Sequence, residues 1–209
     1  MSEPVFRIPK KRYGGDTTVV SMRISRELLT DIDKVADLSE FWNGQKNIVL
    51  LDPNITACRE WKDLFQQLID SGAYVDFSQG LDIRLITDEK AEMIKKIKVK
   101  QLHFAWDKYE DKELILPKFR QFKEISGFDY RKLSVFVLCG FNTTYEQDFD
   151  RIYTLRDMGY NPYVMIYNKE NLPKGHKLRK LQRYVNNRFI FRTVNNFDDY
   201  LKGSNNNAE

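Results

Sequence analysis

The sequence predicts an α/β fold, either an open parallel sheet or an incomplete barrel of about five strands. The first observation behind this prediction is a set of short apolar runs that recur about every 25 to 30 residues. The second is that helical hydrophobic patterns separate the runs. The third is that most runs end in a polar side chain or a glycine. The five runs are residues 48–52, 74–77, 102–107, 135–140 and 163–167. Because parallel α/β folds bind ligands at the carboxyl ends of their strands, we expect a site there.

Composition limits the class of protein. The chain has 209 residues, of which 42% are hydrophobic, and a net charge of +4, which suits one sizeable α/β domain with a small appendage. No apolar run is long enough to cross a membrane, and the polar, basic start does not resemble a secretory signal. Two distant cysteines, Cys58 and Cys139, form no disulfide framework, so a cytoplasmic location is expected.

Four segments are predicted along the chain. Residues 1–16 have no periodicity and are expected to form a basic flexible tail. Residues 17–38 contain an alternating strand followed by an amphipathic helix, for which Ser25 is a good N-cap. The strand–helix rhythm occupies residues 39–201, and residues 202–209 are polar and predicted to be disordered.

The helices of the rhythmic segment are predicted from their caps and apolar stripes. A basic helix is expected over residues 176–185, followed by an edge strand at residues 189–191. Basic residues crowd residues 174–192 as well as the first 26 positions, and such clusters either bind phosphate groups or form solvated surface. The other expected boundaries are a helix over 56–71 ended by Gly72, a helix capped by Thr87, a helix opened by Pro117 and ended by Gly127, and a helix with a Thr143–Glu146 capping box ended by Gly159.

Several common functional motifs are absent from the sequence. It contains neither a Gly-x-x-x-x-Gly-Lys phosphate loop nor a Gly-x-Gly-x-x-Gly dinucleotide turn. The only histidines are His103 and His176, and no Cys/His cluster has zinc spacing. His103 lies inside an apolar run, which favours a residue in or near the core over a base or a ligand.

Polar groups follow the first two apolar runs. Asp52 and Asn54 fit either a turn between strand and helix or a ligand contact. After the second run, Asp82 and Arg84 either pair with each other or bind the hydroxyls and carboxylate of a ligand. Asp76, Ser78 and Gln79 accompany them, and Gly80 would allow close approach of the backbone to a ligand.

The third and fourth runs also end in polar groups. Trp106 and Asp107 either combine a packing residue with a helix cap or provide a stacking surface and a hydroxyl acceptor. Gly140, Asn142 and Thr143 precede a predicted helix, whose N-terminus favours an anion. The capping box alone accounts for Thr143.

Taken in order, several motifs resemble the radical S-adenosylmethionine enzymes, in a branch common in bacteria and phages. The resemblance covers roughly residues 38–200 and is carried by residues 49–54 (VLLDPN), 75–84 (VDFSQGLDIR), 104–107 (FAWD), 137–144 (VLCGFNTT), 151–153 (RIY) and 162–165 (PYVM). It implies the later strands of a partial (β/α)6 barrel and S-adenosylmethionine as cofactor. By resemblance, the residues that would face the cofactor or substrate are Ser78, Gln79, Asp82, Arg84 and Asp107, and the segment around Gly140 and Asn142 would approach the adenine.

The chain departs from this family at the iron–sulfur cluster. The family holds a four-iron, four-sulfur cluster with a Cys-x-x-x-Cys-x-x-Cys triplet after the first barrel strand, because such clusters take thiolate ligands. The sequence has no such triplet. Cys58 is expected on the border between the apolar and polar faces of a helix and Cys139 near a strand end, so neither replaces the triplet. We therefore expect a domain without its cluster segment, inactive alone.

In place of the cluster segment, residues 17–38 resemble the strand and first helix of ribbon–helix–helix DNA-binding proteins. That resemblance implies that Val19, Ser21 and Arg23 face the major groove of DNA and that the chain dimerises. The alternative is an additional strand–helix unit at the edge of the sheet.

Three hypotheses therefore stay open: a radical S-adenosylmethionine-type domain with a small-molecule or peptide substrate, a DNA-binding regulator, and a truncated or fused fragment without function. No membrane partner is expected for any of them.

Overall fold

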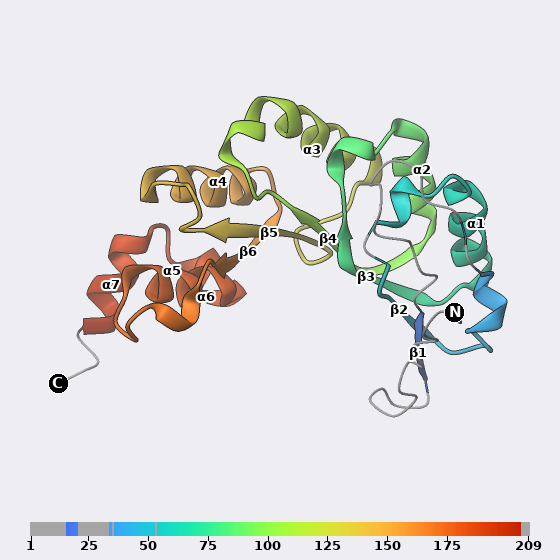
Figure 1. The fold of residues 1–209 in the computed structure, drawn as a ribbon, viewed down its shortest axis with the longest axis horizontal. Helices are drawn as coiled ribbons and strands as arrows, with labels where there is room; N and C mark the ends of the chain where they lie inside the picture. The colour runs from blue at the N-terminus through green and yellow to red at the C-terminus, as the bar shows by residue number, and fades with distance from the viewer. Residues whose placement is uncertain (1–15, 21–33, 35, 53, 206–209) are drawn as a thin grey trace, which may run out of the picture. The chain divides into compact units, whose positions relative to one another are not determined.

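The structure is a computed structural model that describes residues 16–20, 34, 36–52 and 54–205. It has an α/β fold with an open, parallel sheet that alternates with helices (Figure 1). This confirms the predicted fold class. Contacts divide the chain into two compact units, residues 1–103 with 121–128 and residues 104–120 with 129–209. We call these unit 1 and unit 2.

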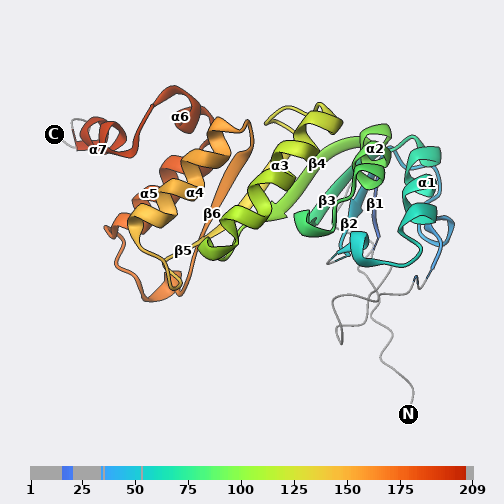
Figure 2. The same ribbon diagram turned by 90° about the horizontal axis from the view of Figure 1, so that it is seen from above.

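Unit 1 contains the first strands of the sheet. Its strands pair in parallel, with Thr17 opposite Asn47 and Asn47 opposite Tyr74. The helices α1 and α2 pack against each other (Figure 2). The elements are β1 (Thr17–Val20), η1 (Leu38–Glu40), β2 (Asn47–Leu50), η2 (Ile55–Ala57), α1 (Trp61–Ser71), β3 (Tyr74–Leu81), η3 (Ile83–Leu85), α2 (Asp88–Lys96) and most of β4 (Lys98–Ala105).

Alternating and helical hydrophobic patterns account for these elements. Alternate residues of β2 and β3 are buried, among them Leu50 and Phe77. One stripe of α1 buries Phe65, whose ring meets that of Phe77 edge-on with centroids 6.4 Å apart. The helix α1 ends as predicted at Gly72, which is left-handed with φ of 60°.

Unit 2 contains the end of β4 and the rest of the chain. Its strands β5 and β6 pair in parallel, with Ser134 opposite Asn161. A cluster of aromatic rings joins α4 to the three last helices, which group together in Figure 1. The elements are η4 (Tyr109–Asp111), α3 (Lys112–Ser126, its last part in unit 1), β5 (Leu133–Cys139), α4 (Tyr145–Asp157), β6 (Asn161–Ile166), η5 (Lys169–Asn171), α5 (Lys177–Asn186), α6 (Arg188–Thr193) and α7 (Phe197–Asn205).

The strand order follows the chain, β1-β2-β3-β4-β5-β6. The five predicted strands are β2 to β6, and β1 adds a further strand beside β2. A doubly wound fold reverses its strand order at a switch point, whereas this order has no reversal. Successive right-handed connections in one direction place helices on one face of a sheet, as in (β/α) barrels.

Side chains of α5 cover the outer edge of β6. The Val164 amide donates to Asn186 Oδ1 at 2.8 Å, and the Val164 carbonyl accepts from Asn186 Nδ2 at 3.1 Å and from Gln182 Nε2 at 2.9 Å. Together, the two amide side chains bind backbone groups that a further strand would otherwise bind. An exposed strand edge promotes association with other chains, so this contact protects the edge at Val164.

Five local predictions are wrong. Pro117 lies inside α3 instead of opening it, because η4 leads directly into the helix and Ile115 and Leu116 are buried in the turn before the proline. The edge strand predicted at residues 189–191 is the helix α6, whose first turn is capped by the Asn187 side chain at the Ile190 amide. Short apolar runs do not separate strand from helix by periodicity alone.

The other three errors concern the start of a helix. The helix predicted over residues 56–71 begins at Trp61, because residues 55–57 form the separate 3-10 turn η2. The capping box of α4 uses Thr144 and Gln147, one residue later than predicted, because the Thr143 hydroxyl donates to Asp148 instead. Cys58 follows η2 and precedes α1, so it lies on neither face of the helix α1. The predicted boundaries at Thr87, Gly127, Gly159 and His176 agree with the structure to within about a residue.

Several predicted segments lie partly outside the described residues. These are the tail 1–16, the helix after Ser25 and residues 206–209. Within the predicted C-terminal tail, α7 continues to Asn205. The described residues include no helix with the length and hydrophobicity needed to span a membrane.

Candidate functional site

The strand ends of unit 1 are joined by neutral hydrogen bonds. The Ser78 hydroxyl donates to the Leu50 carbonyl at 2.9 Å and so joins β3 to β2. Beyond the two strands, buried Asn54 accepts from the Thr56 hydroxyl and, at 3.4 Å, from the Asp82 amide. The turn interpretation of Asn54 is therefore sufficient, and the Ser78 hydroxyl proton is used within the chain.

Lys90 adds a cation to this network. Its Nζ donates to the carbonyl of Thr56 at 2.8 Å and to that of Leu85 at 3.1 Å, and so connects the loops that follow β2 and β3. It also lies 5.2 Å from the centroid of the Trp61 ring. Burial lowers the pKa of Lys90, since desolvation disfavours the charged ammonium.

Asp82 and Arg84 pair with each other, which was one of the two predicted alternatives. The guanidinium binds both carboxylate oxygens, with distances of 2.7 to 3.1 Å. Asp82 also accepts from the Arg84 amide and caps η3. Gln79, in contrast, is exposed, and its side chain has no hydrogen-bond partner among the described residues. Of the four predicted cofactor contacts in unit 1, Gln79 is thus the one that the chain leaves most available.

Asp76 and His103 face each other on β3 and β4. Asp76 Oδ1 lies 3.8 Å from His103 Nε2, and both side chains are partly buried. Burial raises the pKa of the Asp76 carboxyl, against a smaller lowering by Lys100. The expectation that His103 is a residue near the core agrees with this burial.

In unit 2, a buried ion pair joins the strand ends. Arg151 and Asp148 of α4 are 0% and 1% exposed, and Arg151 Nη2 lies 2.6 Å from Asp148 Oδ1. The Arg151 guanidinium also donates to the carbonyls of Trp106, Asp107 and Leu138 at 2.7, 3.0 and 2.8 Å. It therefore holds the ends of β4 and β5 together.

Asp148 completes this arrangement from the other side of the ion pair. Its carboxylate accepts from the Gly140 amide at 3.2 Å and from the Thr143 hydroxyl at 2.8 Å. We call Asp148, Arg151 and the backbone groups that they bind the strand-end clamp. A buried pair is stable when its remaining donors and acceptors are satisfied, and here backbone groups satisfy most of them.

The clamp positions Asp107, the predicted hydroxyl acceptor. Its backbone carbonyl binds Arg151, while its carboxylate is exposed and has no hydrogen-bond partner among the described residues. Partial desolvation raises the pKa of this carboxyl, with Arg151 lowering it and Asp111 raising it by smaller amounts. The neighbouring Trp106 is buried and donates from its indole to the Lys108 carbonyl at 2.8 Å, so it is a packing residue and not an exposed stacking surface.

Gly140 and Asn142 both have left-handed backbone conformations, with φ of 74° and 53°. The left-handed backbone itself favours glycine at position 140, and a Cβ there would in addition lie 2.8 Å from Cδ1 of Leu178 in α5. The Gly140 amide is used by Asp148. Asn142 is exposed, and its side chain has no hydrogen-bond partner in the part of the chain that the structure describes.

The clamp residues were not predicted as site residues, although the sequence contains a signal for them. Asp148, Arg151, Ile152 and Leu155 are spaced as one helical stripe, and all four are buried. Charged residues at the apolar positions of an amphipathic helix are rarely buried unless they are paired. This pattern could have identified Asp148 and Arg151 as a buried pair.

The two cysteines do not fit an iron–sulfur cluster. A four-iron cluster of this family needs three thiolates, and the sequence has two cysteines. Cys58 and Cys139 are both buried, and they belong to different units. Burial raises the pKa of the Cys139 thiol far above its usual range, which disfavours the thiolate. No group of three or more His, Cys, Asp and Glu side chains within the described residues could hold a metal ion.

Of the predicted DNA-contacting residues, only Val19 lies within the described backbone. Val19 is opposite Val49 in the parallel pairing of β1 with β2, whereas Ser21 and Arg23 lie outside the described residues. This parallel pairing agrees with the alternative interpretation of residues 17–38, an additional strand–helix unit at the edge of the sheet. The DNA contacts themselves stay predictions.

No protein-family model, no curated protein and no solved structure matches the chain. A functional assignment therefore rests on the sequence motifs and on the contacts described above.

Proposed function

We propose that the chain is a radical S-adenosylmethionine-type domain that binds the adenosyl part of that cofactor and does not by itself cleave it. The observation that carries the proposal is the strand-end clamp. It fixes Asp107 and Gly140, which come from two separate motifs of the resemblance, to one buried ion pair. The sequential strand order supports the same assignment, because barrels of this type have it.

The clamp leaves two polar side chains of unit 2 available to a ligand. The Asp107 carboxylate suits the hydroxyls of a ribose, because an ionised carboxylate accepts hydrogen bonds strongly. Asn142 offers both a donor and an acceptor, as recognition of an adenine edge needs. The Gly140 amide is bound to Asp148, so we assign it a part in shaping the loop and no direct contact with the ligand.

The cluster chemistry of the family is not part of this proposal, because the cysteines do not fit it. The chain's own residues would bind and orient the nucleoside, and no reaction step is assigned to them.

Equilibrium dialysis with S-adenosylmethionine tests the binding. We expect saturable binding that Asp107→Ala weakens about tenfold, since a hydrogen bond to a charged group contributes roughly 1.5–3 kcal/mol. Asp157→Ala is the matched control, because Asp157 is an exposed carboxylate of the same unit. Absence of binding to the wild-type chain, or equal loss in both variants, would contradict the proposal.

Anaerobic reconstitution with iron and sulfide tests the second part of the proposal, that the chain does not by itself cleave S-adenosylmethionine. We expect no four-iron cluster and no 5′-deoxyadenosine after addition of a reductant. Formation of both products would show that the chain cleaves the cofactor and would refute the proposal.

A further inference from the structure

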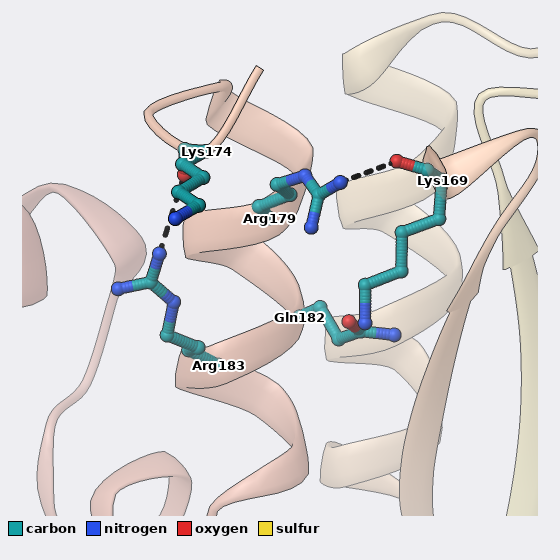
Figure 3. A pocket seen from close by; sticks show the side chains of 5 residues that line it. All are labelled: Lys169, Lys174, Arg179, Gln182 and Arg183. Atoms are coloured by element: carbon teal, nitrogen blue, oxygen red, sulfur yellow. Dashed lines mark hydrogen bonds between the residues drawn. The ribbon is translucent and has the colours of Figure 1, made fainter. Parts of the chain in front are cut away.

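A basic pocket lies beside α5 in unit 2. Its volume is about 170 Å³, and the side chains around it are shown in Figure 3. Arg179, Gln182 and Arg183 are three and four positions apart on the helix, so they share one face. The lining residues are Lys169, Lys174, Arg179, Gln182 and Arg183. We call this set the α5 pocket.

The four cations of the α5 pocket are not neutralised within the described chain. None of them forms an ion pair with a carboxylate of the described residues, whereas Lys112 pairs with Asp150 and Arg151 with Asp148. Four positive charges around one hollow create a local positive potential that attracts an anion.

Backbone carbonyls hold the two arginines in place. Arg179 donates to the carbonyls of Leu172 and Lys169 at 3.0 and 2.6 Å, and Arg183 donates to the Lys174 carbonyl at 3.3 Å. Each guanidinium has five N–H donors, so further donors remain on both. These contacts already restrict the two arginine side chains, so the binding of an anion costs less side-chain entropy.

The dimensions favour a single phosphate group. Pockets for drug-sized molecules have volumes of about 300 to 1,000 Å³, which exceeds the volume here. Arginine forks and lysine ammonium groups are the usual partners of phosphate oxygens.

An exposed aromatic pair lies close to the pocket along the chain. Phe141 and Tyr167 are 42% and 45% exposed, and their ring centroids are 4.7 Å apart. Tyr167 is held at the end of β5 by a 3.1 Å hydrogen bond from its amide to the Cys139 carbonyl. Tyr167 precedes the pocket residue Lys169 by two positions, which limits the separation of their Cα atoms to about 7 Å.

We propose that the α5 pocket and the Phe141–Tyr167 pair form a binding site for single-stranded nucleic acid. The pocket takes a backbone phosphate, and the rings stack on a base. Proteins that bind single strands without sequence preference combine these two elements, a basic groove and aromatic platforms. A bare phosphate would use the pocket alone, so the rings favour a ligand that also has a base, and a polymer presents several phosphates to the four cations.

Fluorescence anisotropy of a labelled 20-residue oligouridylate, with the full chain at 50 to 200 mM salt, tests the site. We expect binding that weakens as salt rises. The double variant Lys169→Gln/Lys174→Gln should weaken binding about tenfold at low salt and reduce the slope of log K against log salt by about 1.4, at roughly 0.7 for each contact with a single strand. Lys169 and Lys174 bind the two arginines through their backbone carbonyls, which the substitutions leave in place, so the fold should be kept.

Lys95→Gln/Lys96→Gln is the matched control, because both lysines are exposed at the end of α2 in unit 1 and the change in net charge is the same. Tyr167→Ala tests the stacking part, with an expected loss of about fivefold or more. Circular dichroism of each variant checks that it is folded.

Three outcomes would overturn the proposal: no binding by the wild-type chain at 50 mM salt, equal weakening in the pocket and control variants, or an unchanged affinity in Tyr167→Ala. A competition arm separates the sources of phosphate. If uridine monophosphate or inorganic phosphate displaces the oligonucleotide at equal phosphate concentration, the ligand is a small phosphate compound and the polymer assignment fails.

Discussion

Unit 2 contains arginines in two contrasting settings, the strand-end clamp and the α5 pocket. In the clamp, Arg151 is fully buried, and its Nη atoms bind three carbonyls and a carboxylate. In the pocket, Arg179 and Arg183 bind carbonyls only and have no acidic partner among the described residues. The contrast teaches that the partners of a cation decide its contribution. An arginine that binds both a carboxylate and carbonyls, as Arg151 does, stabilises the fold. An arginine that binds carbonyls alone, as Arg179 and Arg183 do, remains able to bind an anion.

The clamp gives the largest expected effect on stability. Arg151→Met should lower the free energy of unfolding by about 3–5 kcal/mol, because it leaves the Asp148 carboxylate buried and uncompensated. Urea unfolding followed by circular dichroism measures the change. Arg131→Met is the control, since Arg131 forms an exposed pair with Asp129, and its unfolding midpoint should stay unchanged.

A second variant separates the cost of leaving the Asp148 carboxylate unpaired from the other effects of removing Arg151. Adding Asp148→Leu to Arg151→Met removes the unpaired carboxylate and should recover part of the lost stability. A loss below about 1 kcal/mol in Arg151→Met would show that the clamp is no more important than a surface pair.

The next effect concerns the face of α5 that covers β6. Asn186→Leu should cost about 1–3 kcal/mol of unfolding free energy, because the Val164 amide loses its acceptor in a buried position. Equilibrium unfolding in urea measures it, with exposed Asn171→Leu as the control. If both variants unfold at the same urea concentration, Asn186 does not protect the strand edge. This prediction bears on the comparison of the two settings, because the same helix, α5, both covers the edge of β6 and lines the α5 pocket.

A moderate effect is expected where the clamp meets α5. Gly140→Ala forces an alanine to a φ of 74° and places its Cβ against Leu178, which should cost about 1–2 kcal/mol. Thermal unfolding monitors the change. Gly175→Ala is the control, because a Cβ there meets nothing within 4 Å, and this variant should be neutral or slightly stabilising. Equal melting temperatures of the two variants would mean that the Gly140 loop can relax without loss.

A smaller, pH-dependent effect is expected at Asp107. Its folded-state pKa is raised above the unfolded value of about 3.9, so the folded chain binds more protons and this group lowers stability as pH rises above that value. Asp107→Asn should therefore become more stable than the wild type between about pH 4 and the folded-state pKa, by less than about 0.5 kcal/mol because the side chain is exposed. Urea midpoints of both proteins from pH 3 to 7 measure the difference. A difference of the opposite sign would show that the attraction of Arg151 outweighs desolvation.

The smallest effect on stability is expected in the α5 pocket. Lys169→Gln/Lys174→Gln should leave the melting temperature unchanged or raise it slightly, because the substitutions remove positive charges that repel one another. Differential scanning calorimetry at low salt checks this. A clear loss of stability would mean that the pocket cations support the fold as Arg151 does, and the contrast between the two settings would fail.

The sequence predicted the sheet well because its five buried strands and the helices between them follow strong, local patterns. Gly72 and Thr87 were located by caps whose effect does not depend on the rest of the fold. The errors at Pro117 and at residues 189–191 have a tertiary origin. Burial of Ile115, Leu116 and Phe191 decided between local conformations of similar energy.

The candidate site was less predictable for a different reason. Sequence patterns located polar residues at the strand ends but could not show which partners they have. Asp82 and Arg84 bind each other, and the Gly140 amide binds Asp148, a residue eight positions later. Gln79, Asp107 and Asn142 remained exposed, and only the folded structure distinguishes them from the others.

The sequential strand order also bears on how the chain folds. Each strand pairs with one that lies about 30 positions away, as Thr17 with Asn47 and Ser134 with Asn161. Pairing between strands that are neighbours in sequence closes smaller loops than pairing between distant strands would, which lowers the entropy cost of each closure. The sheet can therefore grow by adding one strand–helix unit after another, in the order in which a ribosome delivers them.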